Sequence, residues 1–287
     1  MENDNKQVEE IVKKWFTKTA RYEWRRLRQD PYHQVEFIIT MHFLEKYLPK
    51  QGLVLDAGGG PGRYTIELAK RGYDVALLDF VPKMLKLAKR KIKQAGVLKK
   101  VKQFVEGSVE DLFMFPNQKF DAVLCLGAPL CHLLNVEQRE KAAEELLRVA
   151  RRGAPIIVSV ISRIGLLETI LVEFPQEMQY AEHHWEVGDY VPSLQGEGFT
   201  AAHWFMPEEL CELFEKQGAE ILEMAGLEGL SSNHRKETNR LYKDQEKWKM
   251  WTEILLKTCT HPSVVGSSEH FLLCAESTTR LRHCRAC

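Results

Sequence analysis

Short apolar runs alternate along the chain with segments in which apolar residues recur every three or four positions. The runs predict buried strands, and the longer spacing predicts amphipathic helices. Strands are expected at 53–58, 73–79, 101–107, 120–127, 154–162, 219–226 and 269–275. Helices are expected near 6–28 and at 31–48, 63–72, 84–96, 137–150, 206–218 and 237–258. This alternation indicates an α/β fold with a mostly parallel sheet covered by helices on both faces.

The alternation is interrupted once, at residues 163–205, where apolar pieces mix with polar, aromatic and histidine-rich ones. Regular elements resume directly afterwards, so we interpret this stretch as an insertion after the fifth strand rather than a second domain. The expected organisation is an N-terminal helical cap (1–49) and a main domain (50–275). The last residues, 276–287, have no periodicity and are expected to be a disordered tail.

Composition narrows the class of protein. With 44% hydrophobic and 28% charged residues, the 287-residue chain is typical of a globular protein. Its 40 basic and 40 acidic residues balance, which argues against a general attraction to nucleic acid. No signal peptide begins the chain, no apolar run approaches the roughly 20 residues of a membrane span, and the seven cysteines form no disulfide pattern. These features predict a cytoplasmic protein and say nothing about its oligomeric state.

A glycine-rich turn follows the first predicted strand, in "LVLDAGGGPGRYTIELAKRGYDVALLD" (53–79). Such a turn lets the backbone approach a ligand at the carboxyl end of a strand, where open α/β sheets bind nucleotides. Asp79 ends the second strand, at the position from which an acid accepts hydrogen bonds from a ribose. A dinucleotide or an adenosyl ligand would fit so far.

The spacing of the turn separates these two ligands. A dinucleotide turn follows G-x-G-x-x-G/A, and the position of its third small residue is occupied here by Arg63. Asp56, just before the glycines, would also face an incoming pyrophosphate. Both points weaken the dinucleotide interpretation, although it stays open.

Four stretches together carry a family resemblance: "VLDAGGGPG", "LLDFVPKMLKLAKRK", "VEGSVEDL" and "FDAVLCLGAPLCHLL". They resemble the successive motifs of class I S-adenosylmethionine (SAM)-dependent methyltransferases over about residues 50–162. The resemblance implies a Rossmann-like fold with a seven-stranded sheet whose last strand, 269–275, runs antiparallel. Within the class, the chain looks most like the small-molecule branch that includes quinone-biosynthesis methyltransferases.

The resemblance also implies which residues contact the cofactor. They are Asp56, Gly58, Gly60 and Gly62 near the methionine part, Asp79 at the ribose, Phe80 and Met84 against the adenosine, Ser108 and Val109 at the adenine, and Leu126 beside the methyl group. The amide of Val109 is the implied base contact. Ser108 stands where many relatives have Asp, and Glu110 is the alternative side-chain contact.

Methyl transfer from SAM requires an aligned acceptor atom, and a base only if that atom must lose a proton. His132 is the candidate base, because it follows the fourth strand near the implied methyl site and histidine titrates near neutral pH. The alternative is that His132 only packs or hydrogen-bonds in a loop. A nucleophilic pair of Cys131 and His132 is a weaker alternative, since neighbours in sequence often point apart.

Aromatic and imidazole side chains gather in the insertion and in the two N-terminal helices. Five of them are candidates to line an acceptor site: Tyr22, Tyr32, His184, His203 and Trp204. Aromatic walls suit a flat or apolar acceptor and attract cations. A hydrophobic cluster that pins the insertion to the sheet is the alternative. No metal is expected, because the histidines show no familiar ligand spacing.

The segment "PKMLKLAKRKIKQAGVLKKVK" (82–102) is densely basic. It is interpreted as the solvated face of a helix, with a docking patch for a charged carrier or RNA as the alternative. The sequence therefore predicts a SAM-dependent methyltransferase that acts on a small molecule by in-line displacement. The alternatives are an NAD-dependent oxidoreductase, a nucleic-acid methyltransferase that uses the basic helices, and a non-catalytic SAM sensor.

Overall fold

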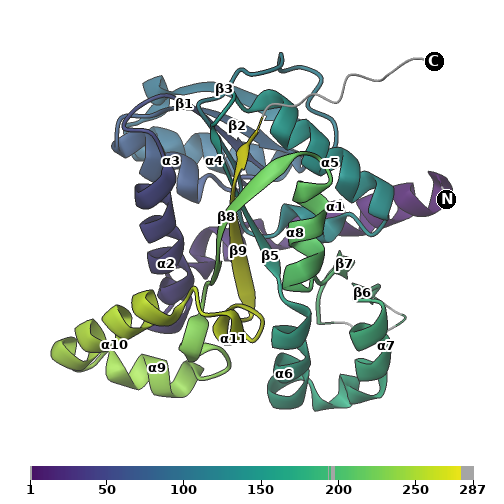
Figure 1. The fold of residues 1–287 in the computed structure, drawn as a ribbon, viewed down its shortest axis with the longest axis vertical. Helices are drawn as coiled ribbons and strands as arrows, with labels where there is room; N and C mark the ends of the chain where they lie inside the picture. Colours follow the sequence, from purple (N-terminus) through teal and green to yellow (C-terminus); the bar gives the residue numbers. More distant parts are fainter. Residues whose placement is uncertain (1, 193, 195–197, 279–287) are drawn as a thin grey trace.

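A seven-stranded sheet runs through the centre of the molecule, between helices on both of its faces (Figure 1). The computed structural model describes residues 2–192, 194 and 198–278. The strands are β1 Leu53–Ala57, β2 Asp74–Asp79, β3 Val101–Glu106, β4 Ala122–Cys125, β5 Pro155–Ile161, β8 Ala219–Gly226 and β9 His270–Ser277. Their order in the sheet is β3-β2-β1-β4-β5-β9-β8. The first five are parallel, and β9 runs antiparallel to both neighbours, which confirms the predicted fold.

Alternate residues of each strand enter different cores, because successive side chains of a strand point to opposite faces. The larger helices are α1 Glu2–Arg26, α2 Pro31–Tyr47, α3 Arg63–Lys70, α4 Pro82–Gln94, α5 Val136–Val149, α8 Pro207–Glu215 and α10 Gln245–Thr258. Val54 belongs to one core with residues of α2, α3 and α10, whereas Leu55 belongs to another with residues of α5 and α8. The strand order changes direction between β1 and β4, so the carboxyl end of β1 lies at the switch point where such sheets bind ligands.

Capping residues explain where two helices begin. Asp30 accepts a hydrogen bond from the amide of His33 at 3.0 Å and starts α2, as predicted. The single helix predicted over 237–258 is wrong, since it is divided into α9 (Arg235–Leu241) and α10. Asp244 caps the second helix by accepting from the amide of Lys247, and this cap ends the continuity of the helical pattern.

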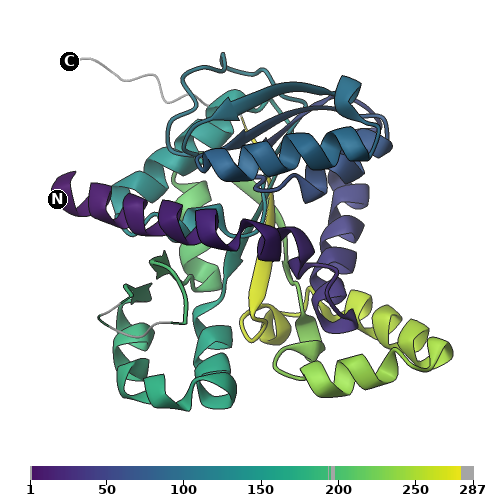
Figure 2. The same cartoon turned by 180° about the vertical axis from the view of Figure 1, so that it is seen from behind.

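The insertion forms a small helical unit beside the end of β5. It contains α6 Arg163–Glu173, η3 Pro175–Tyr180, α7 Ala181–Glu186 and the short strands β6 Asp189–Tyr190 and β7 Ala202–His203. Ser162 and Phe205 pair where the insertion leaves and rejoins the main fold. In Figure 2, α1 (purple) crosses the molecule between α4 and this unit. Helix α1 is therefore positioned to cover the ligand-binding switch point at the carboxyl end of β1.

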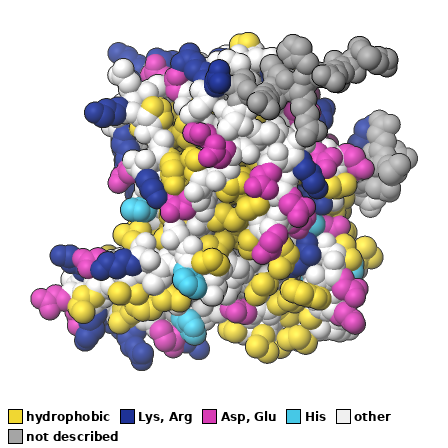
Figure 3. Space-filling model, viewed as in Figure 1, with side chains coloured by type: hydrophobic (Ala, Val, Ile, Leu, Met, Phe, Trp, Pro, Cys, Tyr) yellow, Lys and Arg dark blue, Asp and Glu magenta, His cyan; other side chains and the backbone are white. Residues whose placement is uncertain are grey.

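The remaining short helices are η1 Leu98–Lys100, η2 Pro129–His132, η4 Gly229–Ser231 and α11 Pro262–Val265. Strand β9 continues to Ser277, so the first residues of the predicted tail belong to the sheet. Residues 279–287 lie outside the described part of the chain. Figure 3 shows apolar side chains on the surface of the lower half of the molecule. The exposed large apolar side chains include Leu171 and Val172 of α6, Trp185 of α7, and Met250 and Ile254 of α10. Within the described residues, no helix is both long and apolar enough to cross a membrane.

Candidate functional site

The glycine turn after β1 is held in a left-handed conformation against β2. Gly58, Gly60 and Gly62 have φ angles of +73°, +54° and +81°, which L side chains rarely adopt. The amide of Gly58 donates to the carbonyl of Leu78 at 2.8 Å. A Cβ atom at Gly58 would lie 2.4 Å from Cγ of Pro129, so no larger residue fits there.

Asp79 closes the same turn from the end of β2. One carboxylate oxygen accepts from the amide of Gly60 and the other from the amide of Val81, both at 2.8 Å. Burial raises the pKa of Asp79 to about 7, although the two amide donors act to lower it. Because Asp79 lines a cavity and each carboxylate oxygen has further lone pairs, it can accept two more donors, as a ribose diol would supply.

One cavity brings together eight of the ten residues expected at the cofactor. They are Gly58, Gly60, Asp79, Phe80, Met84, Ser108, Val109 and Leu126. The alternative contact Glu110 lines it as well, and burial raises the pKa of that carboxyl. Gly59 and Pro129, which the sequence did not single out, also belong to the lining.

Asp56 and Gly62 do not line this cavity, so the structure does not place them where they were predicted to contact the cofactor. Asp56 is fully buried behind the turn, where the hydroxyl of Thr65 donates to it at 2.5 Å. Burial raises the pKa of Asp56 to about 6. Gly62 starts α3, and a Cβ atom there would meet Ala88 of α4 at 3.2 Å, so this glycine permits close packing of two helices.

A second cavity of about 460 Å³ adjoins the first. Five residues line both cavities: Phe16, Glu23, Arg26, Gly127 and His132. We call these five residues the junction. Its positions come from α1 and from the segment after β4, so α1 closes the site from the side opposite the sheet.

His132 lies at the junction with a defined tautomer. Its Nδ1 is 2.9 Å from the carbonyl oxygen of Ala201, and since a carbonyl only accepts, Nδ1 carries the proton. Burial lowers the pKa of His132 to about 4, so the ring is neutral near pH 7. The rings of Phe16 and Phe199 flank it at centroid distances of 4.9 and 6.0 Å. The lone pair of Nε2 is therefore the reactive position of this side chain.

The backbone before His132 is unusual for its residue types. Gly127 and Ala128 have φ angles of +82° and +67°, so a non-glycine residue occupies the left-handed region. Such conformations cost free energy and concentrate at functional sites. The neighbouring Cys131 is fully buried in the core and accepts from the amide of Ile161 at 3.2 Å. Burial raises its pKa to about 12, so the alternative of a nucleophilic cysteine is wrong.

The five predicted acceptor-site residues divide into two groups. Tyr22, Tyr32 and Trp204 line the second cavity. His184 and His203 do not, and the predictions for both are corrected. His184 is fully buried among aromatic rings of the insertion, including that of Trp204 at 4.9 Å.

His203 is tied on both ring nitrogens to carboxylates. Nδ1 lies 2.6 Å from Asp189, and Nε2 lies 2.6 Å from Glu209 of α8. Arg163 also binds Glu209, at 3.0 Å. This cluster fastens the insertion to the main fold, so the histidine-rich pattern marks a structural ion-pair network rather than a substrate contact.

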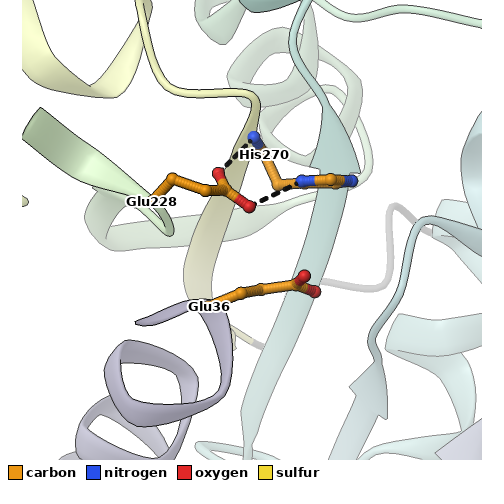
Figure 4. Close-up of side chains that lie close together, drawn as sticks. All are labelled: Glu36, Glu228 and His270. Carbon is orange, nitrogen blue, oxygen red and sulfur yellow. Dashed lines mark hydrogen bonds and ion pairs between the residues drawn. The ribbon is translucent and has the colours of Figure 1, made fainter. Parts of the chain in front are cut away.

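A buried charge network lines part of the second cavity. Figure 4 shows three of its members, Glu36, Glu228 and His270. Glu36 of α2 binds both terminal nitrogens of Arg26, and Glu228 binds the ring and the amide of His270 at 2.8 Å each. Burial acts to lower the pKa of His270, but Glu228 and Glu36 outweigh it and raise the pKa to about 9. Atoms that could bind a metal ion lie within 4.8 Å of one another in Glu36, Glu228 and His270. The two carboxylates are already neutralised by cations, however, which are Arg26 and His270. This network was not predicted from the sequence, although Glu36, an acid on the apolar side of the predicted helix 31–48, was a usable signal.

Comparison with known proteins identifies the central part of the chain. Residues 54–153 match the family model described as "Methyltransferase domain". The glycine/sarcosine N-methyltransferase of Aphanothece halophytica is 31% identical over 118 residues, 40% of this chain and 43% of the relative. The ubiquinone/menaquinone biosynthesis C-methyltransferase of Vibrio cholerae is 32% identical over 114 residues, 38% and 41% of the two chains. The chain thus spans less than half the length of these curated relatives.

Solved structures extend the likeness of the fold to most of the chain. A SAM-dependent methyltransferase of Methanosarcina mazei has a TM-score of 0.58 at 19% identity, over 83% of this chain and 98% of its own. The 1,6-didemethyltoxoflavin-N1-methyltransferase of Burkholderia thailandensis, solved with its substrate and S-adenosylhomocysteine, has a TM-score of 0.55 at 16% identity. That match covers 95% of this chain and 90% of the other.

Proposed function

We propose that this chain transfers a methyl group from S-adenosylmethionine (SAM) to a small-molecule acceptor, because residues 54–153 match a methyltransferase domain and the fold resembles that of a solved SAM-dependent methyltransferase. The junction is the observation that carries the proposal: a cavity lined by eight of the residues predicted to hold the cofactor meets a second cavity at five shared positions. The second cavity is large enough for a small molecule and lies partly under α1.

The residues present fit the cofactor. The left-handed turn at Gly58 and Gly60 forms a cradle without side chains, and Asp79 offers a buried carboxylate for the ribose. Phe80 and Met84 supply apolar surface for the adenine, with Val109 beyond them. When bound, SAM supplies an activated methyl group on a sulfonium, which an aligned nucleophile displaces.

The chain's own part in the reaction is to align the acceptor and to exclude water. Positioning of this kind supplies much of the acceleration in a displacement reaction. We propose that His132, through the lone pair of Nε2, holds the acceptor atom and removes its proton where one must leave. A cytoplasmic location and a small-molecule partner remain predictions of the same account.

Turnover is tested by mixing the full chain with SAM and panels of small amines, alcohols, thiols and phenols, and by measuring formation of S-adenosylhomocysteine (SAH). Acceptor-dependent formation of SAH is the expected result. Tight binding of SAH without turnover on any panel would instead support the SAM-sensor alternative. Preference for RNA or DNA, with affinity that falls steeply with salt, would support the nucleic-acid alternative.

A further inference from the structure

The second cavity carries an excess of acidic side chains. Its described lining contains one arginine, three histidines and no lysine, against five glutamates: Glu23, Glu36, Glu177, Glu228 and Glu269. We propose that the acceptor is an amine, which binds as an ammonium ion on an apolar body and is methylated on nitrogen. This inference rests on the proposed methyltransferase function and adds the class of acceptor.

Two of the five glutamates are already neutralised. Glu36 takes both terminal nitrogens of Arg26, and Glu228 takes His270. Because both cations are engaged in this way, neither is free to bind the carboxylate or phosphate of a ligand. An anionic acceptor would therefore enter the cavity without a counter-charge.

The other three glutamates are less completely paired with cations. Among the described residues, Glu269 accepts from neutral groups only, the hydroxyl of Tyr32 and the amide of Asn233. Among the described residues, no arginine or lysine pairs with Glu177. Glu23 has Nε of Arg26 at 3.7 Å, while the terminal nitrogens of that arginine belong to Glu36. A ligand cation would supply the missing charge.

Aromatic rings form the rest of the wall. Eight aromatic residues line the cavity: Trp15, Phe16, Tyr22, Tyr32, Phe174, Tyr190, Phe199 and Trp204. Ring faces attract cations and also bury apolar surface. Aromatic rings combined with incompletely paired carboxylates suit an amine on an apolar body better than a neutral alcohol or an acid.

Glu23 places this charge where methyl transfer would occur. It lines both cavities, whereas Glu177 and Glu269 line the second alone. Burial raises the pKa of Glu23 and outweighs the lowering effect of Arg26, and the neighbouring carboxylate of Glu36 raises it further. An ammonium beside Glu23 would lie at the junction with His132.

An ammonium has no lone pair, so it must lose one proton before it can attack. In the proposed step, the proton leaves by way of Nε2 of His132, which passes it on to water before the attack, because burial lowers the pKa of this ring to about 4. The positive charge of the bound sulfonium would favour the neutral amine. The amine nitrogen then attacks the methyl carbon, and the electron pair of the S–C bond stays on sulfur. The products are SAH and the N-methylated ammonium, and one proton has gone to water.

The test uses the full chain saturated with SAH and probes that share one body. The two sets are 2-phenylethylamine, 2-phenylethanol and phenylacetate, and hexylamine, hexanol and hexanoate. Calorimetry at pH 7.5 is expected to give, in at least one set, an amine affinity about tenfold or more above that of the alcohol. The carboxylate should bind most weakly. Equal or tighter binding of the alcohols or carboxylates, or no binding of any amine, would overturn the proposal.

Substitutions test the carboxylates themselves. Glu23→Gln and Glu177→Gln should each lower the amine affinity about tenfold and leave the alcohol affinity unchanged. Glu212→Gln, at an exposed position of α8, is the matched control. Unchanged amine affinity in both cavity variants would also overturn the inference. Failure of SAH to bind the wild-type chain would refute the proposed function instead, and the amine preference could still be measured without it.

Discussion

Asp79 should make cofactor binding depend on pH in the neutral range. In the free protein its carboxylate is buried, and this burial raises its pKa to about 7 although two amides donate to it. A ribose diol would add two more donors to the same carboxylate. A protonated carboxyl cannot accept all four, because one of its oxygens then carries hydrogen. Binding therefore favours the ionised form and releases a proton when the free protein is protonated.

The expected change of SAH affinity with pH follows from this linkage between binding and protonation. Below pH 7 a growing fraction of free Asp79 is protonated, so affinity falls as the pH is lowered and is constant well above pH 7. If bound ligand lowers the pKa below about 5, the affinity for SAH at pH 5.5 should be about 30-fold lower than at pH 8. Calorimetric titration across this range, in buffers with different ionisation enthalpies, measures both the affinity and the released proton.

Two variants show whether Asp79 is responsible. Asp79→Asn should bind SAH weakly and with the same affinity at every pH in this range. Asp56→Asn should keep the pH dependence, because Asp56 lies behind the turn, where burial raises its pKa to about 6 but no ligand reaches it. An affinity that is equal at pH 5.5 and 8, or a pH dependence that survives in Asp79→Asn, would refute this reasoning.

Three further substitutions test other parts of the site. Gly58→Ala should abolish SAH binding and lower the free energy of unfolding, measured with denaturant, by about 2 kcal/mol or more, since its Cβ would lie 2.4 Å from a proline ring. The control is Gly72→Ala, at a position with positive φ but open space. It should lower the free energy of unfolding by about 1 kcal/mol and keep SAH binding. His132→Ala should lower turnover about 100-fold or more while the SAH affinity changes little; unchanged turnover would assign His132 a packing role. Arg26→Met should lower the free energy of unfolding by about 3–5 kcal/mol, because it leaves Glu36 buried without the partner that neutralises it. The additional substitution Glu36→Leu should recover most of that stability.

The sheet could be predicted from the sequence because most of its strands are local apolar runs and their neighbours follow from simple rules of connection. The cavity proposed for the cofactor was predictable for a similar reason. Its glycines are adjacent in the chain, and Asp79 ends the next strand, which pairs directly with β1. The break at Asp244 was missed because apolar periodicity continues across it, and only the hydrogen bond of its side chain reveals the cap.

The second cavity, which we propose for the acceptor, is built from contacts between residues that are distant in the sequence. Glu36 and Arg26 lie on different helices, and Glu228 meets His270 across 42 positions, so no local spacing predicts these pairs. His203 shows the converse error. Its histidine-rich neighbourhood suggested a lid, but two carboxylates that no local pattern would associate with it hold both ring nitrogens.

The central claim is that the glycine turn and Asp79 hold SAM rather than a dinucleotide. Calorimetric titration of the purified full chain with SAH, and with NADH in parallel, tests it most directly. The account predicts that SAH binds in the micromolar range or tighter, that NADH does not bind, and that Gly58→Ala loses the SAH signal. Binding of NADH without binding of SAH would contradict it and would require a test of hydride transfer instead.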